Sequence, residues 1–189
     1  MRRLVVALMF LFPAAAMAEV SGSALVMDGD TVTVQGQDIS LYGVNAPSIV
    51  QSCGIDDGMW QCGWDAANRL EEIIAGRTVT CTDVEENAEG KLIGRCNVDG
   101  EDLAGVMIDE GLAVPDPDTG ADYQARATVA SDAKVGMWSG PFIDPQTWAE
   151  IGGCSCSARK KSMMETAALL KAQREAEEAE AATEEELTN

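Results

Sequence analysis

The sequence contains no histidine, and only 5% of its residues are aromatic. The absence of histidine excludes Ser-His-Asp catalysis, histidine-based metal nucleases and most zinc enzymes. Basic residues are also scarce, because 13 lysines and arginines stand against 32 aspartates and glutamates, for a formal charge of −19. Nucleic-acid binding draws much of its affinity from basic side chains at phosphates, and residues 19–150 contain no basic cluster. The composition therefore disfavours DNA or RNA as a partner and leaves carboxylates for any acid–base or metal chemistry.

The first residues have the pattern of an export signal. Two arginines precede an apolar run from Leu4 to about Ala16, and Ala16-Met17-Ala18 is a small-x-small cleavage sequence. The apolar run of about 13 residues is shorter than the roughly 20 needed to span a bilayer. We therefore expect a signal peptide over residues 1–18, an exported protein that is periplasmic or secreted, and no membrane span. Removal of two of the 13 basic residues leaves 11 against 32 acids, a charge of −21.

The six cysteines indicate disulfide bonds in an exported chain. Their spacing favours two bridges, one around a short loop and one across the arms of a hairpin, Cys53–Cys62 and Cys81–Cys96. Cys154 and Cys156 would be strained if they bridged each other directly. A zinc site is the alternative for this last pair, although neither a CxxC motif nor a histidine accompanies it.

The order of elements predicts a small barrel. Alternating residues and turn pairs indicate three strands in a meander over residues 22–48, and two further strands over 78–84 and 91–98. Residues 49–58 are expected to be a polar loop. Helices are expected over 60–75, with one face formed by Trp60, Trp64, Ala67, Leu70 and Ile74, and over about 101–110 and 121–135. The fold class is therefore α+β, an OB-fold five-stranded Greek-key barrel with three flanking helices, in a domain over residues 19–150.

Residues 151–189 form a compositionally distinct acidic tail. Met163, Ala167 and Leu170 give a short apolar stripe that disappears into glutamates. This pattern favours a solvated, fraying helix or a disordered tail, whose removal after about Cys156 would leave the melting temperature nearly unchanged. The alternative is a tail that docks on the barrel through Met163, Met164 and Leu170.

Several short motifs occur in a consistent order along the chain. They are Asp28-Gly29-Asp30-Thr31, Gly43-Val44-Asn45-Ala46-Pro47, Gly90-Lys91, Gly111-Leu112-Ala113 and Gly136-Met137-Trp138-Ser139-Gly140-Pro141-Phe142. Together they resemble the staphylococcal nuclease (thermonuclease) family over residues 22–148. The resemblance implies a calcium-dependent phosphodiesterase on a five-stranded OB barrel.

The resemblance also assigns a role to particular positions. Two acidic side chains and a backbone carbonyl would hold calcium, a glutamate would be the general base, and two arginines would clamp the phosphoryl group. The metal positions are occupied by Asp30, Asn45 and the Ala46 carbonyl. The catalytic positions are occupied by Ser48 for the base, Ser40 for the first arginine and Lys91 for the second. Only Asp30 keeps its residue type, and Lys91 keeps a charge without the arginine fork.

The substitutions favour a protein that is catalytically silent or strongly impaired, and that acts as a binding or scaffold module. Its partner would be an unidentified protein or envelope component that contacts the barrel surface or the tail. A calcium-dependent nuclease with a rearranged site is the alternative, and calcium stays a possible ligand. A structural envelope protein that associates through its tail is a third reading. Nearby acids could substitute for the lost groups, namely Asp38, Asp56 and Asp57. Arg95 is about 13 Å from Lys91 along their strand, which is too far for Arg95 to replace it. Asp28-Gly29 could instead be retained as a turn in which Asp30 accepts backbone N–H groups.

Overall fold

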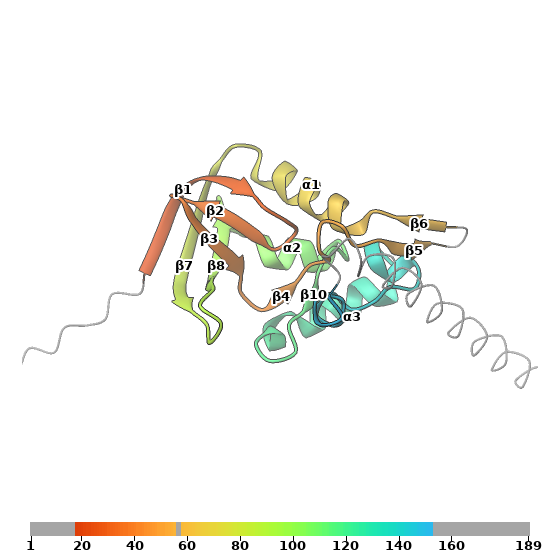
Figure 1. Ribbon diagram of the computed structural model, residues 1–189. Helices are drawn as coiled ribbons and strands as arrows, with labels where there is room; N and C mark the ends of the chain where they lie inside the picture. The colour runs from red at the N-terminus through yellow and green to blue at the C-terminus, as the bar shows by residue number, and fades with distance from the viewer. Residues whose placement is uncertain (1–17, 56–57, 153–189) are drawn as a thin grey trace, which may run out of the picture.

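The computed structural model describes residues 18–55 and 58–152. Its centre is a barrel of five strands, β1 (Ala18–Val26), β2 (Thr31–Val34), β3 (Gln37–Leu41), β7 (Thr78–Glu86) and β8 (Leu92–Val98). Neighbouring strands are antiparallel in the order β3-β2-β1-β7-β8, and a parallel β3–β8 pairing closes the barrel (Figure 1). The expected OB-type α+β fold is confirmed.

The alternation of residue types in the strands decides which side faces the core. Val32 and Val34 of β2 are fully buried, whereas Thr31 and Thr33 lie on the outer face. The same alternation on β3, β7 and β8 adds further buried side chains to the core, which are Ile39, Leu41, Val79, Cys81, Cys96 and Val98. The outer face of β2 and β3 is therefore the one that presents Thr31 and Ser40.

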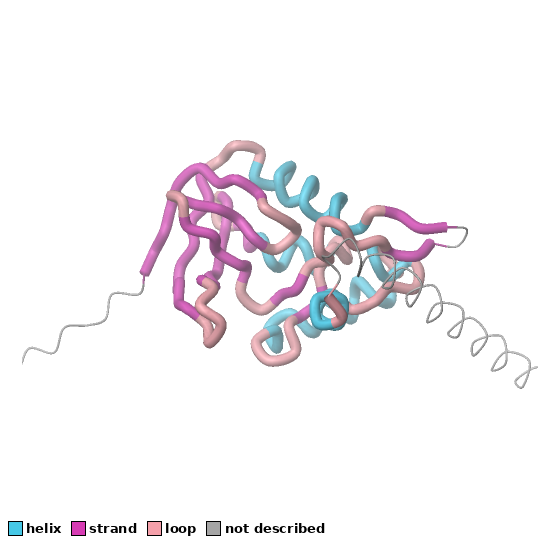
Figure 2. Tube along the Cα trace, viewed as in Figure 1, coloured by secondary structure: helices cyan, strands magenta, loops and turns pink. Residues whose placement is uncertain are grey.

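Helices cover one side and one end of the barrel. They are α1 (Cys62–Ile74), α2 (Leu103–Asp109), α3 (Gln124–Asp132) and α4 (Pro145–Glu150), with 3₁₀ turns η1 (Gly120–Tyr123) and η2 (Gly136–Ser139). Short strands complete the fold, namely β4 (Val44–Asn45) with β10 (Val114–Pro115), β5 (Cys53–Ile55) with β6 (Gly58–Trp60), and β9 (Glu101–Asp102) beside β8. Figure 2 shows the barrel strands gathered at one end of the molecule, and the β5 and β6 strands with most of the helices toward the other.

The segment before α1 differs from the sequence prediction. Residues 53–55 and 58–60 pair as β5 and β6 where a polar loop and the start of a helix were expected, and α1 begins at Cys62 instead of Trp60. Trp60 lies in β6, and Trp64, which was expected on the buried face, is 55% exposed. Tertiary contacts override the helical pattern here. The Gly54 N–H donates to the Pro141 carbonyl at 2.8 Å, which fixes β5 against the C-terminal part of the domain.

Later helices also differ in detail. The predicted helix over 121–135 is divided into η1 and α3, and α4 is an additional helix. Asp144 caps α4 by accepting from the N–H groups of Gln146 and Thr147. Trp148 of α4 is buried, and the rings of Trp138 and Phe142 pack edge to face with their centres 5.1 Å apart.

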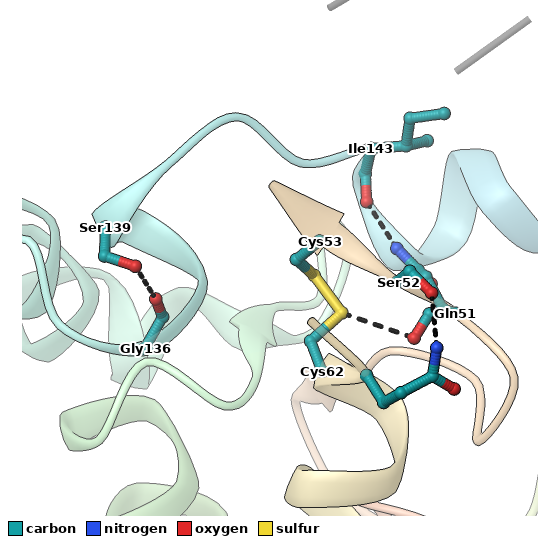
Figure 3. The surroundings of a disulfide bond; sticks show 8 residues. Gln51, Ser52, Cys53, Cys62, Gly136, Ser139 and Ile143 are labelled. Atoms are coloured by element: carbon teal, nitrogen blue, oxygen red, sulfur yellow. Dashed lines mark hydrogen bonds between the residues drawn. A yellow bond between two sulfur atoms is a disulfide. The ribbon is translucent and has the colours of Figure 1, made fainter. Parts of the chain in front are cut away.

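Both expected disulfides are present. Cys81 and Cys96 are directly opposite in the β7–β8 ladder with their Cα atoms 4.0 Å apart, and the Cys53–Cys62 bond joins β5 to the start of α1. Figure 3 shows that the Cys53–Cys62 bond lies beside Gln51, whose side-chain amide donates to the Ile143 carbonyl at 2.7 Å. Several predictions concern residues outside the described ranges. These residues are 1–17 of the predicted signal peptide, Asp56 and Asp57, and the tail beyond Gly152 with Cys154 and Cys156. Among those described, no helix has the length and apolar character to cross a membrane.

Candidate functional site

Asp30 lies at the end of the turn that leads into β2, beside the Ala46 backbone. Its Oδ2 accepts from the Ala46 N–H at 2.6 Å, and its Oδ1 accepts from the Thr31 hydroxyl at 3.1 Å. The turn reaches this position because Gly29 has no side chain. A Cβ atom on Gly29 would lie 2.7 Å from the Cβ atoms of both Ala46 and Ala66. Both carboxylate oxygens are thus used by donors of the protein.

The surroundings of Asp30 favour its neutral form. Burial of the carboxyl group, and then the charge of Asp28, raise its pKa to about 7, against the lowering effect of the Ala46 and Thr31 hydrogen bonds. Asp28 also accepts from the Asp30 N–H at 3.2 Å, as an Asx turn does. Asp30 therefore accepts hydrogen bonds from the Thr31 hydroxyl at the start of β2 and from the Ala46 N–H. A pKa of about 7 leaves its carboxyl group only partly ionised at neutral pH.

Asn45 is directed at a different acid. It lies in β4 opposite Val114 of β10, and its Nδ2 donates to Oδ2 of Asp116 at 3.1 Å. Oδ1 of Asp116 accepts from the Thr119 N–H, the Thr119 hydroxyl and the Asp118 N–H at 2.8–3.0 Å. Burial raises the pKa of Asp116, but these hydrogen bonds outweigh it and hold the pKa below its usual value.

Asp116 was not identified as a site residue from the sequence. The available signal was Asp116-Pro117-Asp118-Thr119, a turn sequence in which an aspartate accepts N–H groups two and three residues later. That signal predicts the turn, but not the contact with Asn45, which is 71 residues away in the chain.

The two serines occupy different surroundings. Ser40 is opposite Thr31 in the β2–β3 ladder, and their hydroxyl oxygens are 3.4 Å apart. Ser40, Thr31 and Asp30 thus form a polar row without a cation. Ser48 lies against the start of α1, because its carbonyl would clash with any Cβ atom on Gly63. The same carbonyl accepts from the Gln51 N–H at 2.6 Å.

The cations near the site are few, and the arginines among them are engaged. Lys91 is exposed at the end of the β7–β8 hairpin, where its backbone N–H donates to Oδ1 of Asn87. Arg95 donates to Asp122 at 2.8 Å and lies 4.2 Å from the ring centre of Tyr42. The arginines of the described ranges all form ion pairs with acids, and they are Arg69, Arg77, Arg95 and Arg126.

Of the acids considered as substitutes, Asp38 is the one that lies in the described residues, and it is engaged away from Asp30. Asp38 is exposed on β3 and accepts from the Thr33 hydroxyl, opposite it in the ladder. Within residues 18–55 and 58–152, no group of three or more aspartate, glutamate or cysteine side chains is placed to hold a metal ion. The structure therefore brings together Asp30, Ala46 and Ser40, but directs Asn45 toward Asp116.

Comparison with known proteins identifies the family. A family model described as staphylococcal nuclease homologue matches residues 38–140, which is more than half of the chain. The chain belongs to the staphylococcal nuclease homologue family. Within this staphylococcal nuclease homologue domain, the match covers Ser40, Asn45, Ser48 and Lys91 and begins after Asp30.

A relative of known name supports the same assignment. The chain is 31% identical over 136 residues to the succinoglycan biosynthesis protein ExoI of Rhizobium meliloti (strain 1021). The aligned region covers 70% of this chain and 71% of that protein. The similarity to ExoI thus extends over most of both proteins.

Proposed function

We propose that this member of the staphylococcal nuclease homologue family is an exported binding or scaffold module without calcium-dependent phosphodiesterase activity. The observation that carries the proposal is the use of the two metal positions. Asp30 accepts from the Ala46 N–H and Thr31 hydroxyl, while the amide of Asn45 donates to Asp116. Side chains that would hold calcium in an active enzyme are here part of the hydrogen bonding of the fold.

The donor set fits calcium poorly. Calcium takes about six to eight oxygen ligands and favours charged ones. Asp30 is the only charged side chain at the metal positions, and its pKa of about 7 means that binding would have to displace a proton from a fraction of the molecules. Asn45 offers no charge, and its amide nitrogen is the atom directed at Asp116. We therefore propose that calcium does not bind specifically at this site.

The chemical groups for hydrolysis are also replaced. Ser48 cannot accept a proton from water at neutral pH without a base, and Ser40 cannot neutralise a phosphoryl oxygen. Loss of one electrostatic donor commonly lowers a rate by about a hundred- to a thousandfold. Loss of the base, one arginine and one metal ligand together leaves little basis for turnover.

The alternative is a calcium-dependent nuclease with a rearranged site. The observation in its favour is Asp30 itself, since a carboxyl group with a pKa near 7 suits general acid–base catalysis. Lys91 would supply one cation. This reading requires that mutation of Asp30 abolish a measurable activity, whereas the favoured reading requires that there be none.

The proposed location is outside the cytoplasm. Two buried disulfides are typical of proteins that fold in an oxidising compartment, and the N-terminal pattern is that of a signal peptide. ExoI is named as a succinoglycan biosynthesis protein. We propose that this chain likewise serves an envelope or secreted partner, which fits the absence of a basic cluster for nucleic acid from the sequence of residues 19–150.

A calcium melting experiment tests the proposal. A ligand at about 100 times its Kd stabilises the folded state by about 2.7 kcal/mol, which raises Tm by roughly 5–10 °C for a chain of this size. We expect any effect of calcium on Tm to be equal in the wild type and in Asp30→Asn, with magnesium as the control for general screening of an acidic protein. A rise specific to calcium that Asp30→Asn removes would support the nuclease reading.

A further inference from the structure

Most of the exposed apolar side chains of this domain belong to the segment before and at the start of α1, and one more is at the last described residues. Nine large apolar residues of the described ranges are exposed, and six of them belong to residues 49–64 or to position 151. These six, called here the exit surface, are Ile49, Val50, Ile55, Met59, Trp64 and Ile151. Trp64 and Met59 are at least half exposed. A group of exposed apolar side chains on neighbouring segments is typical of a surface that binds a partner.

Hydrogen bonds and close contacts tie the segments of the exit surface to one another. The Cα atom of Ile49 lies 3.0 Å from the Cβ position of Gly63, the neighbour of Trp64 in α1. Ile55 of β5 lies against Gly140, whose Cβ position is 3.1 Å from the Ile55 Cα atom. Gln51 donates to the Ile143 carbonyl, just before the helix that ends next to Ile151 (Figure 3). The segment that leads into α4, and so to the last described residues, is therefore held against β5 and the loop before it.

The charge around the exit surface is of one sign. Residues 19–150 contain six basic and 24 acidic residues, a formal charge of −18. No lysine or arginine occurs in residues 43–68 or 135–158. Asp65 and Glu150, which flank Trp64 and Ile151, are exposed. A segment that covers this surface should be apolar on one side and positively charged.

One segment of the same chain has this composition. Residues 157–174 contain five basic residues and one acid, a charge of +4, and include the sequence Arg159-Lys160-Lys161. Met163, Ala167 and Leu170 follow at helical spacing, with Met164 and Leu169 beside them. The glutamates that make the tail acidic begin only at Glu175. The tail is thus divided into a basic apolar half and an acidic half.

We propose that residues 159–170 dock on the exit surface of the same molecule, with Met163, Met164 and Leu170 against its apolar side chains. The 11 residues between Ile151 and Met163 can span up to about 40 Å when extended, which is ample for a surface beside the exit point. Arg159, Lys160 and Lys161 then lie near the acids of the domain. This is the docked alternative for the tail, and it predicts an effect of truncation that a solvated tail does not.

Trp64 provides a direct reporter of docking. It is the exposed tryptophan of the described ranges, whereas the others are buried or partly buried. Truncation after Cys156 should shift its emission to longer wavelength, increase its quenching by acrylamide and lower Tm by roughly 3–6 °C. The same shift should follow from Met163→Asp with Met164→Asp in the full chain. The matched control is Ala181→Asp with Ala182→Asp, which adds the same charge outside the docking segment and should change neither readout.

A second pair of variants tests the surface. Trp64→Asp should make Tm insensitive to truncation, whereas Val129→Asp, which replaces an exposed apolar residue on α3, should leave the effect of truncation intact. Raising the salt concentration should reduce the effect because the tail segment and the domain have opposite charge. Equal emission, quenching and Tm in the full and truncated chains would overturn the proposal. A truncation effect that grows with protein concentration would overturn it too, since the tail would then bind a second copy.

Discussion

The contact between Asn45 and Asp116 predicts that restoring the family's aspartate at position 45 is harmful. In Asn45→Asp, an oxygen with negative charge replaces the amide nitrogen that is 3.1 Å from Oδ2 of Asp116. At an effective dielectric constant of about 20, two unit charges about 4 Å apart repel by about 4 kcal/mol. Solvent screens much of this repulsion because the side chains at positions 45 and 116 are partly exposed. Together with the lost hydrogen bond, we expect unfolding free energy at pH 7 to fall by about 1–3 kcal/mol.

The assay is a double-mutant cycle measured by urea denaturation. Asn45→Asp combined with Asp116→Asn exchanges the two partners, so that the amide now at position 116 can donate to the carboxylate now at position 45, and most of the lost stability should return. The cost of the single Asn45→Asp change should also fade as pH is lowered toward about 4, because protonation of one carboxyl group removes the repulsion. Full stability of Asn45→Asp at pH 7, with no dependence on the residue at position 116, would refute the reasoning.

Two further changes test how the turn at Asp30 is held. Because the folded-state pKa of Asp30 is raised to about 7, the folded state binds a proton that the unfolded state has released, and stability falls as pH rises from about 4 to 7. Asp30→Asn should therefore raise the unfolding free energy by about 1–3 kcal/mol at pH 8 and have little effect near pH 4, and an effect independent of pH would contradict this origin. Gly29→Ala should destabilise the domain by about 1–3 kcal/mol because its Cβ atom would meet Ala46 and Ala66. The control Gly58→Ala should not destabilise it, since nothing lies within 4 Å of that Cβ position. Equal melting temperatures for the two variants would show that the turn can move away.

The barrel could be predicted from the sequence because its signals are local. Alternation in Thr31–Val34, together with turn pairs such as Asp28-Gly29, decides which face of each strand is buried. The Cys81–Cys96 bridge followed from the same kind of hairpin signal, since it requires only that two residues face each other across one ladder.

The region before α1 could not be predicted in this way. The β5 and β6 strands have three residues each and no alternation of apolar and polar residues, so their pattern was hidden by the helical spacing of Trp60 and Trp64. The contact of Gly54 with Pro141 comes from a part of the chain about 90 residues away, and no local signal contains it.

The site shows the same division between local and distant information. The substitutions at Ser40, Asn45 and Ser48 are visible in the sequence through the family resemblance, and so is the possibility that Asp30 accepts backbone N–H groups. The destination of the Asn45 side chain is not visible, because Asp116 reaches it only through the β4–β10 pairing.

A cleavage assay on the purified, oxidised protein shows directly whether this domain has calcium-dependent phosphodiesterase activity. Single-stranded DNA and RNA are incubated with calcium, and release of fragments is compared for the wild type, Asp30→Ala and a buffer control. We expect the wild type to show no calcium-stimulated cleavage above buffer and not to differ from Asp30→Ala. Robust turnover by the wild type that calcium stimulates and Asp30→Ala abolishes would contradict this expectation.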